Sequence, residues 1–525
     1  MSKRFLVSCV VCLLACLTST SYSADTVTAQ TVKNPAASKE RYNQIVANLD
    51  IGGDLLIVAN MEGFVQEQVN NLVQIMGIVP DTNKDDQAFK NVINKIPGFL
   101  QKNGCYGMQG FGMSVLPRSD GLNTIKGFLA RDPASSVMPI WRGFVGTAPQ
   151  KLSCLSMLPA DTVLVRAGTG ELNEIWKMFK SGIAEMGSPK TVLEFNQWLS
   201  GSATNVGVDV DKLFASLNGE GFFSLQLSEN AMMNFPKKLG EEPLKIPQPT
   251  ILIGFAVNDD SMMKFMGNIL AKSKMPVTQV QVESTTINTV NMPLPMPIPV
   301  QLSYAMHGKY FLFGTTLQVI TTAIKASGGN SGLTATAHYK KLFQGLSDVN
   351  NGVLYVSPRL MKTIYDIQIS NLAQTEKTSP QAAAIIRDWV SRQNSMEGAF
   401  TFVNCKSGIL VTGISSSSGR EMIGSTMIAP VGLLAAIAIP SFVKARNTAQ
   451  QNACINNLRM LDSAKEQWAL SAKKADGVQV EIPAMLQYIK GAKMPICPKG
   501  GTYKVNVIGQ NPECSIPEHR MRTGN

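Results

Sequence analysis

The sequence predicts an α+β fold, because apolar runs typical of strands alternate with stretches of helical period across residues 42–413. The runs at 161–165 and 250–257 each precede a stretch with apolar residues at helical spacing, at 172–179 and 262–270. Residues 399–403 and 409–413 flank a turn that ends in glycine and predict a hairpin. Mixed hairpins and strand–helix units favour α+β over a doubly wound parallel sheet.

Length and composition limit the organisation of the chain. Its 525 residues suggest about three structural units. Hydrophobic residues make up 44% and charged residues 16%, which excludes a wholly disordered chain. We expect the α+β region to consist of two related halves, 42–150 and 151–413. Only three histidines are present, His307, His338 and His519, too few for a multi-histidine metal site.

The N-terminus is typical of an export signal. Lys3 and Arg4 precede an apolar stretch that is short for a membrane span, and small residues that offer cleavage sites follow it. We therefore expect a signal peptide at 1–24 and a linker at 25–41. Alternatively, Leu13 to Cys16 resembles a lipobox, in which case Cys16 would be lipidated after cleavage.

Export determines how the cysteines are interpreted. Nine cysteines less the three at positions 9, 12 and 16 leave six, an even number that permits disulfides in an oxidising compartment. We predict a disulfide between Cys497 and Cys514, which would stabilise the loop between them by roughly 3 kcal/mol. Cys454 is then unpaired, or it replaces one of these two. Outside the predicted signal peptide no C-x-x-C is present, so the sequence favours neither a zinc ribbon nor thioredoxin-type chemistry, and we predict no metal site.

A second apolar segment, 422–443, has 22 residues without a charge. As a helix it is long enough to span a hydrocarbon core of about 30 Å. The alternative is a buried helix of a soluble domain. The side chains expected to contact lipid or a docking partner are Leu433, Leu434, Ile437, Ile439, Pro440 and Phe442.

Residues 444–525, the C-terminal module, begin with a predicted helix at 444–470. Cys454, Leu458, Leu461, Trp468 and Ala472 fall near one face of that helix. Short β-like pieces follow, including 503–508. The sequence thus predicts a small α+β module with a core of its own.

Two regions resemble known families. The runs at 158–162, 217–221 and 351–356 resemble an exported bacterial family of unknown function, over about 150–410. That resemblance implies an envelope location and no assigned activity. The runs at 432–442 and 451–459, with the tail at 497–503 and 514–517, resemble type IV pilins and type II secretion pseudopilins, over about 422–520. This second resemblance implies a helix that sits in the membrane or in a helical bundle, and a pilus or secretion assembly as partner.

The side of the membrane on which the C-terminal module lies is open at this point. A signal peptide followed by one stop-transfer helix would leave the module in the cytoplasm, and Lys444 and Arg446 agree with that placement. A disulfide and the pilin resemblance favour the outside. We expect an exported protein that is anchored in the membrane and faces the periplasm.

Motifs for an enzyme are absent from the sequence. It contains no P-loop, H-E-x-x-H or G-x-S-x-G, and an exported chain without a nucleic-acid motif is not expected to bind nucleic acid. We therefore expect a non-enzymatic binding or scaffolding protein of the cell envelope, with no cofactor and no catalytic residue. The alternatives are a periplasmic hydrolase of an unrecognised class and a module that binds a hydrophobic ligand through the proline–methionine segment 292–299.

Overall fold

The computed structural model describes residues 35–78, 84–235, 243–291, 300–329, 331–378, 397–422 and 450–519, with short stretches between 380 and 388. Two compact units are present, one up to Glu421 and one from Met422 onward. Each unit has its own hydrophobic core. The first is called the N-terminal unit below, and the second contains the C-terminal module.

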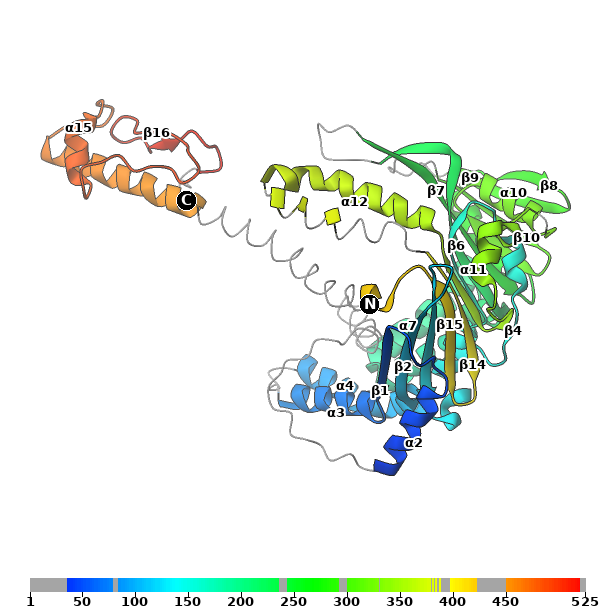
Figure 1. The fold of residues 1–525 in the computed structure, drawn as a ribbon. Helices are drawn as coiled ribbons and strands as arrows, with labels where there is room; N and C mark the ends of the chain where they lie inside the picture. The colour runs from blue at the N-terminus through cyan, green and yellow to red at the C-terminus, as the bar shows by residue number, and fades with distance from the viewer. Residues whose placement is uncertain are drawn as a thin grey trace. The chain divides into compact units, whose positions relative to one another are not determined.

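One antiparallel sheet organises the N-terminal unit, with the strand order β1-β2-β3-β15-β14-β13-β5-β6-β7-β11-β10-β9-β8 (Figure 1). Its strands are β1 (Leu55–Asn60), β2 (Met108–Pro117), β3 (Asn123–Arg131), β5 (Thr162–Gly168), β6 (Leu217–Phe235), β7 (Leu244–Val257), β8 (Thr278–Val282), β9 (Thr285–Asn291), β10 (Gln301–His307), β11 (Tyr310–Gly314), β13 (Gly352–Val356), β14 (Gly398–Cys405) and β15 (Gly408–Ser415). Because β3 pairs with β15, the two predicted halves contribute to the same sheet.

Within the described residues, a strand followed by one or more helices and then by a hairpin recurs in this sheet. β1 leads through α3 (Phe64–Ile78) and α4 (Lys84–Lys102) to β2 and β3. β5 leads through α6 (Leu172–Met186), α7 (Pro189–Val206) and α8 (Val210–Ser216) to β6 and β7. β13 leads into α12 (Pro358–Thr378), which projects from the sheet in Figure 1, and the chain returns as β14 and β15.

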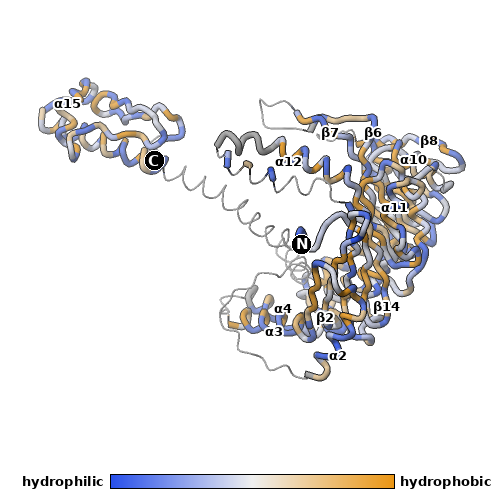
Figure 2. Tube along the Cα trace, viewed as in Figure 1, coloured by the Kyte–Doolittle hydropathy of each residue, from blue (hydrophilic) through white to orange (hydrophobic). Residues whose placement is uncertain are grey.

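The main core lies where α10 (Leu317–Ala326) and α11 (Ala337–Phe343) pack on the sheet. Ile320, Ile324 and Leu342 are fully buried against strand residues such as Leu252 and Leu312. The strands are accordingly rich in hydrophobic residues (Figure 2). A second cluster forms where α2 (Pro35–Val46) covers β3, and a third joins α6, α7 and α8 around aromatic side chains.

Several predicted elements are confirmed. The run at 161–165 lies in β5 and the stretch at 172–179 in α6. Likewise, 250–257 lies in β7 and 262–270 in α9 (Ser261–Ser273), while 399–403 and 409–413 form the β14–β15 hairpin. The predicted α+β class is therefore confirmed.

The C-terminal module contains a helix at 450–471, then α15 (Ile482–Met485), η5 (Leu486–Tyr488) and the strand pair β16 (Tyr503–Lys504) and β17 (Glu513–Cys514). The predicted helical face is confirmed for Cys454, Leu458, Leu461 and Trp468, which are buried. The prediction is wrong for Ala472, which lies beyond the helix and is exposed, because the chain turns there.

Some predictions concern residues that the structure does not describe. The signal peptide with Cys16, the segment 292–299 and almost all of 422–443 lie outside the described residues. The membrane or docking residues Leu433, Leu434, Ile437, Ile439, Pro440 and Phe442 lie outside them as well. No helix among the described residues has both the length and the apolar character that a membrane crossing requires.

Candidate metal centre

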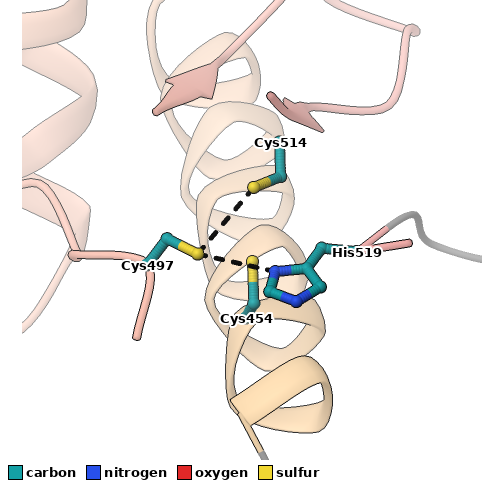
Figure 3. Close-up of side chains that lie close together, drawn as sticks. All are labelled: Cys454, Cys497, Cys514 and His519. Carbon is teal, nitrogen blue, oxygen red and sulfur yellow. Dashed lines mark hydrogen bonds between the residues drawn. The ribbon is translucent and has the colours of Figure 1, made fainter. Parts of the chain in front are cut away.

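Four side chains that can bind a metal converge in the C-terminal module (Figure 3). Cys454 comes from the 450–471 helix, Cys497 from the loop before β16, Cys514 from β17 and His519 from the turn after it. Their ligand atoms all lie within 4.8 Å of one another, and all four residues are buried. The group therefore joins the helix, the loop, the small sheet and the tail of the module.

The distances in this group agree with tetrahedral metal coordination. The Sγ atoms of Cys497 and Cys514 are 3.9 Å apart, and Cys497 Sγ is 3.5 Å from His519 Nδ1. A tetrahedral zinc ion, with Zn–S near 2.3 Å and Zn–N near 2.05 Å, separates two sulfur ligands by about 3.8 Å and sulfur from nitrogen by about 3.6 Å. These two distances are thus already those expected between ligands of one ion, and the remaining ligand atoms lie within 4.8 Å.

A glycine-containing turn positions Cys497. The backbone N–H of Gly500 donates to the carbonyl of Cys497 at 2.9 Å, and Gly500 has a φ of +77°, which favours glycine. At Gly501 a Cβ atom would lie 2.8 Å from the sulfur of Cys514, so a side chain there would displace a ligand. The sequence C-P-K-G-G at 497–501 therefore provides both the turn and the space for the second sulfur.

The surroundings give one thiol the character of a thiolate. Burial by itself raises the pKa of Cys497, but backbone N–H groups of Lys499 and Gly501, together with Cys454 and His519, lower it to about 6. Burial raises the pKa of Cys454 to about 12, although the Tyr503 hydroxyl, which donates to its sulfur at 3.3 Å, acts in the opposite direction. At neutral pH the metal-free group thus favours a thiolate at Cys497 and a protonated thiol at Cys454, and metal binding would displace the proton of Cys454.

His519 has few partners other than this group. The residue is completely buried, and its Nε2 atom has no hydrogen-bond partner among the described residues. Burying an imidazole costs free energy unless its nitrogens are satisfied. Coordination through Nδ1 would compensate for part of this cost.

The composition of the group indicates which metal it would hold and in what role. Thiolate ligands together with one imidazole suit zinc, whereas magnesium and calcium prefer oxygen ligands. Four protein ligands fill a tetrahedral shell and leave no position for water or substrate, which is the pattern of structural rather than catalytic zinc. The arrangement can therefore stabilise a fold, and it offers no open coordination site.

The predicted disulfide between Cys497 and Cys514 is not formed in this structure. Both residues are free thiols, and 3.9 Å is almost twice the S–S bond length of about 2.05 Å. Cys454 and His519 share the same site with the two sulfurs. The expectation of no metal site rests on local sequence spacing, whereas these four residues come together only in the fold.

A buried carboxylate in the N-terminal unit serves packing. Glu220, at the start of β6, accepts hydrogen bonds from the backbone N–H of Cys154 at 2.7 Å and from the Ser153 hydroxyl at 3.2 Å. Lys309 lies 3.6 Å from it. These contacts fix η3 (Ser153–Met157) against the sheet, and the carboxylate is paired there as burial requires.

Comparison with known proteins identifies the N-terminal unit. Residues 107–391 match a family described as "Protein of unknown function (DUF3352)". The match covers more than half of the chain, and the chain belongs to this family. The prediction that the middle region belongs to a family of unknown function is thereby confirmed, and no activity follows from it. The four candidate ligands all lie outside the matched residues.

Searches of curated proteins and of solved structures gave no match. The pilin resemblance of residues 422–520 therefore stays a prediction from the sequence. The N-terminal unit is called the DUF3352 domain below.

Proposed function

We propose that this protein is a non-enzymatic protein of the cell envelope whose C-terminal module is folded around one structural zinc ion. The observation that supports the proposal is the buried group of Cys454, Cys497, Cys514 and His519, spaced as the ligands of a tetrahedral ion. The DUF3352 domain would provide the binding or scaffolding surface. The segment 422–443 would anchor the chain.

Zinc would have a clear role in so small a module. Domains below roughly 70–80 residues bury too little apolar surface for a stable fold and commonly add metals or disulfides. The module's described strands have only two residues each, and its main core is the contact of the 450–471 helix with α15 and the loops. An ion bound by four separate segments would hold these loops on the helix.

The exposed surface of the helix restricts how the module could dock. Most solvent-exposed positions of the 450–471 helix are polar or charged, and the apolar exceptions are Ala453, Met460 and Leu470, the last of which is 80% exposed. Pilin-like helices associate through apolar surfaces. Docking to a pilus or secretion assembly would therefore depend on residues 422–443, and we propose that segment, rather than 450–471, as the contact with lipid or with partner helices.

Metal analysis of the purified full chain tests the zinc proposal. We expect one equivalent of zinc per chain and, after exchange, the visible absorption bands of tetrahedral cobalt(II) with thiolate ligands. Cys454→Ser should lose both signals. Cys405→Ser is the matched control, because Cys405 is a free cysteine of the DUF3352 domain, outside the group. Equal zinc content in the two variants, or a parent chain that retains no zinc, would refute the proposal.

Sedimentation tests the anchor. The full chain should remain with the membrane fraction after salt washing and should enter solution with detergent. A variant lacking residues 422–443 should be released without detergent. Release of the full chain by salt alone would contradict the anchoring role.

A further inference from the structure

We infer that the C-terminal module lies on the cytoplasmic, reducing side of the membrane, opposite to the exported DUF3352 domain. The inference rests on the proposed zinc site and goes beyond it, because it assigns the two units to different compartments. It follows from the chemistry of the four side chains and from the order of segments in the chain.

The cysteine group requires reduced thiols. Three cysteines act as ligands only as thiolates, and two of the sulfurs, on Cys497 and Cys514, are already 3.9 Å apart. In an oxidising compartment, thiols so close are converted to a disulfide by resident oxidants, whereas a reducing cytosol keeps them free. Cysteine clusters in cytosolic proteins are accordingly more often metal sites than disulfides.

One cysteine of the DUF3352 domain, Cys154, has surroundings unlike those of the C-terminal group. Cys154 of the DUF3352 domain is completely buried in the main core, where burial and the neighbouring Glu220 raise the pKa of its thiol. A buried neutral thiol is inert to oxidants. The sulfurs of Cys497 and Cys514 instead lie 3.9 Å apart among four candidate ligands, and without a bound metal such close thiols stay reduced only in a reducing environment.

The order of segments gives the same orientation independently of the cysteines. A cleaved export signal followed by one stop-transfer segment places everything before that segment outside and everything after it inside. Lys444 and Arg446 directly follow the segment 422–443, and basic residues are enriched on the cytoplasmic flank of membrane helices. Two features thus indicate the same side of the membrane. One is the metal site, which needs reduced thiols, and the other is the pair of basic residues that follows the segment 422–443.

Labelling with a membrane-impermeant maleimide tests the inference on the full chain. Ser463→Cys places a new thiol on the exposed face of the 450–471 helix, and Ser200→Cys places one on exposed α7 of the DUF3352 domain. The native cysteines are accounted for by subtracting the labelling of the parent chain. In intact spheroplasts we expect Ser200→Cys to be labelled and Ser463→Cys to be protected. After lysis both should be labelled equally.

Two results would overturn the inference. One is equal labelling of both positions in intact spheroplasts, and the other is protection of both until lysis, which would place both units inside. Zinc content of the same preparations separates the two proposals. Bound zinc together with external labelling of Ser463→Cys refutes the topology and leaves the zinc site standing. A protected module without zinc refutes the metal site and leaves the orientation standing.

Discussion

Removing the metal should unfold the C-terminal module at a lower temperature and leave the DUF3352 domain unaffected. The four ligands come from segments that the unfolded chain does not hold together, since Cys454 and Cys497 are 43 positions apart and Cys514 and His519 follow later. Zinc should therefore bind the folded module far more tightly than the unfolded one. Its binding free energy then adds to the free energy of unfolding of this module only.

The expected size of the effect follows from mass action. With free zinc at 100 times its Kd, binding stabilises the folded state by about 2.7 kcal/mol. For a module of this size each kcal/mol shifts the Tm by about 4–8 °C, so a strong chelator should lower the Tm by about 10–20 °C. A larger excess of zinc over Kd would enlarge the shift.

Calorimetry of the detergent-solubilised full chain measures this shift, because the two compact units have separate cores and are expected to unfold in separate transitions. Cys514→Ser should show the lowered Tm without chelator, and a chelator should add nothing to it. Cys405→Ser should behave like the parent chain. The reasoning fails if the chelator leaves both transitions unchanged, or if it lowers the Tm of Cys514→Ser as much as that of the parent.

Three further predictions address the same structure. Treating the zinc-bound protein with hydrogen peroxide should oxidise Cys497 and Cys514 to one disulfide, with the peroxide reduced to water and one zinc released. Their Sγ atoms are 3.9 Å apart, and peptide mapping that finds Cys454 in the disulfide instead would contradict this pairing. In the metal-free module the pKa of Cys497 is about 6, below its usual value near 9, so the folded state favours the thiolate. The free energy of unfolding should therefore decrease as the pH falls from 9 to 6. Denaturant titration across this range checks the sign, and a flat profile would rule it out. Leu312→Ala, at a fully buried position of β11, should destabilise the DUF3352 domain by about 2–5 kcal/mol and leave the transition of the C-terminal module unchanged.

Local periodicity carried enough information to predict many elements of the fold. β5 with α6, β7 with α9, and the β14–β15 hairpin all have strong patterns of period 2 or 3.6, and the structure confirms them. The order of strands in the sheet could not be obtained in this way. Pairing of β3 with β15 joins Ile125 to Gly413, and no local pattern encodes a contact between residues so far apart.

The candidate metal centre shows a different limit of sequence reasoning. The sequence identifies Cys454, Cys497 and Cys514 as candidates for cross-linking, but an even cysteine count indicates pairs, and no local pattern sets His519 apart from the two other histidines. A metal site needs ligands that are close in space, and here only folding brings the helix and the tail together. Two signals could have indicated the site: a C-P-K-G-G turn suited to a thiolate ligand, and a third cysteine that no pair within the module accommodates.

The choice between a disulfide and a metal has consequences for how the module is held together. A disulfide between Cys497 and Cys514 would close one loop, and the helix would be joined to it only by apolar contacts and hydrogen bonds, such as the one that Asn457 Nδ2 donates to the carbonyl of Ile496 at 3.1 Å. Coordination by all four residues also ties the loop and the tail to the helix through Cys454, directly above the buried Leu458 and Leu461. Loss of zinc should therefore free the helix start near Cys454 before it disturbs the core around Trp468 and Met485. Faster amide hydrogen exchange at 454–461 than at 464–469 after removal of zinc would show that order.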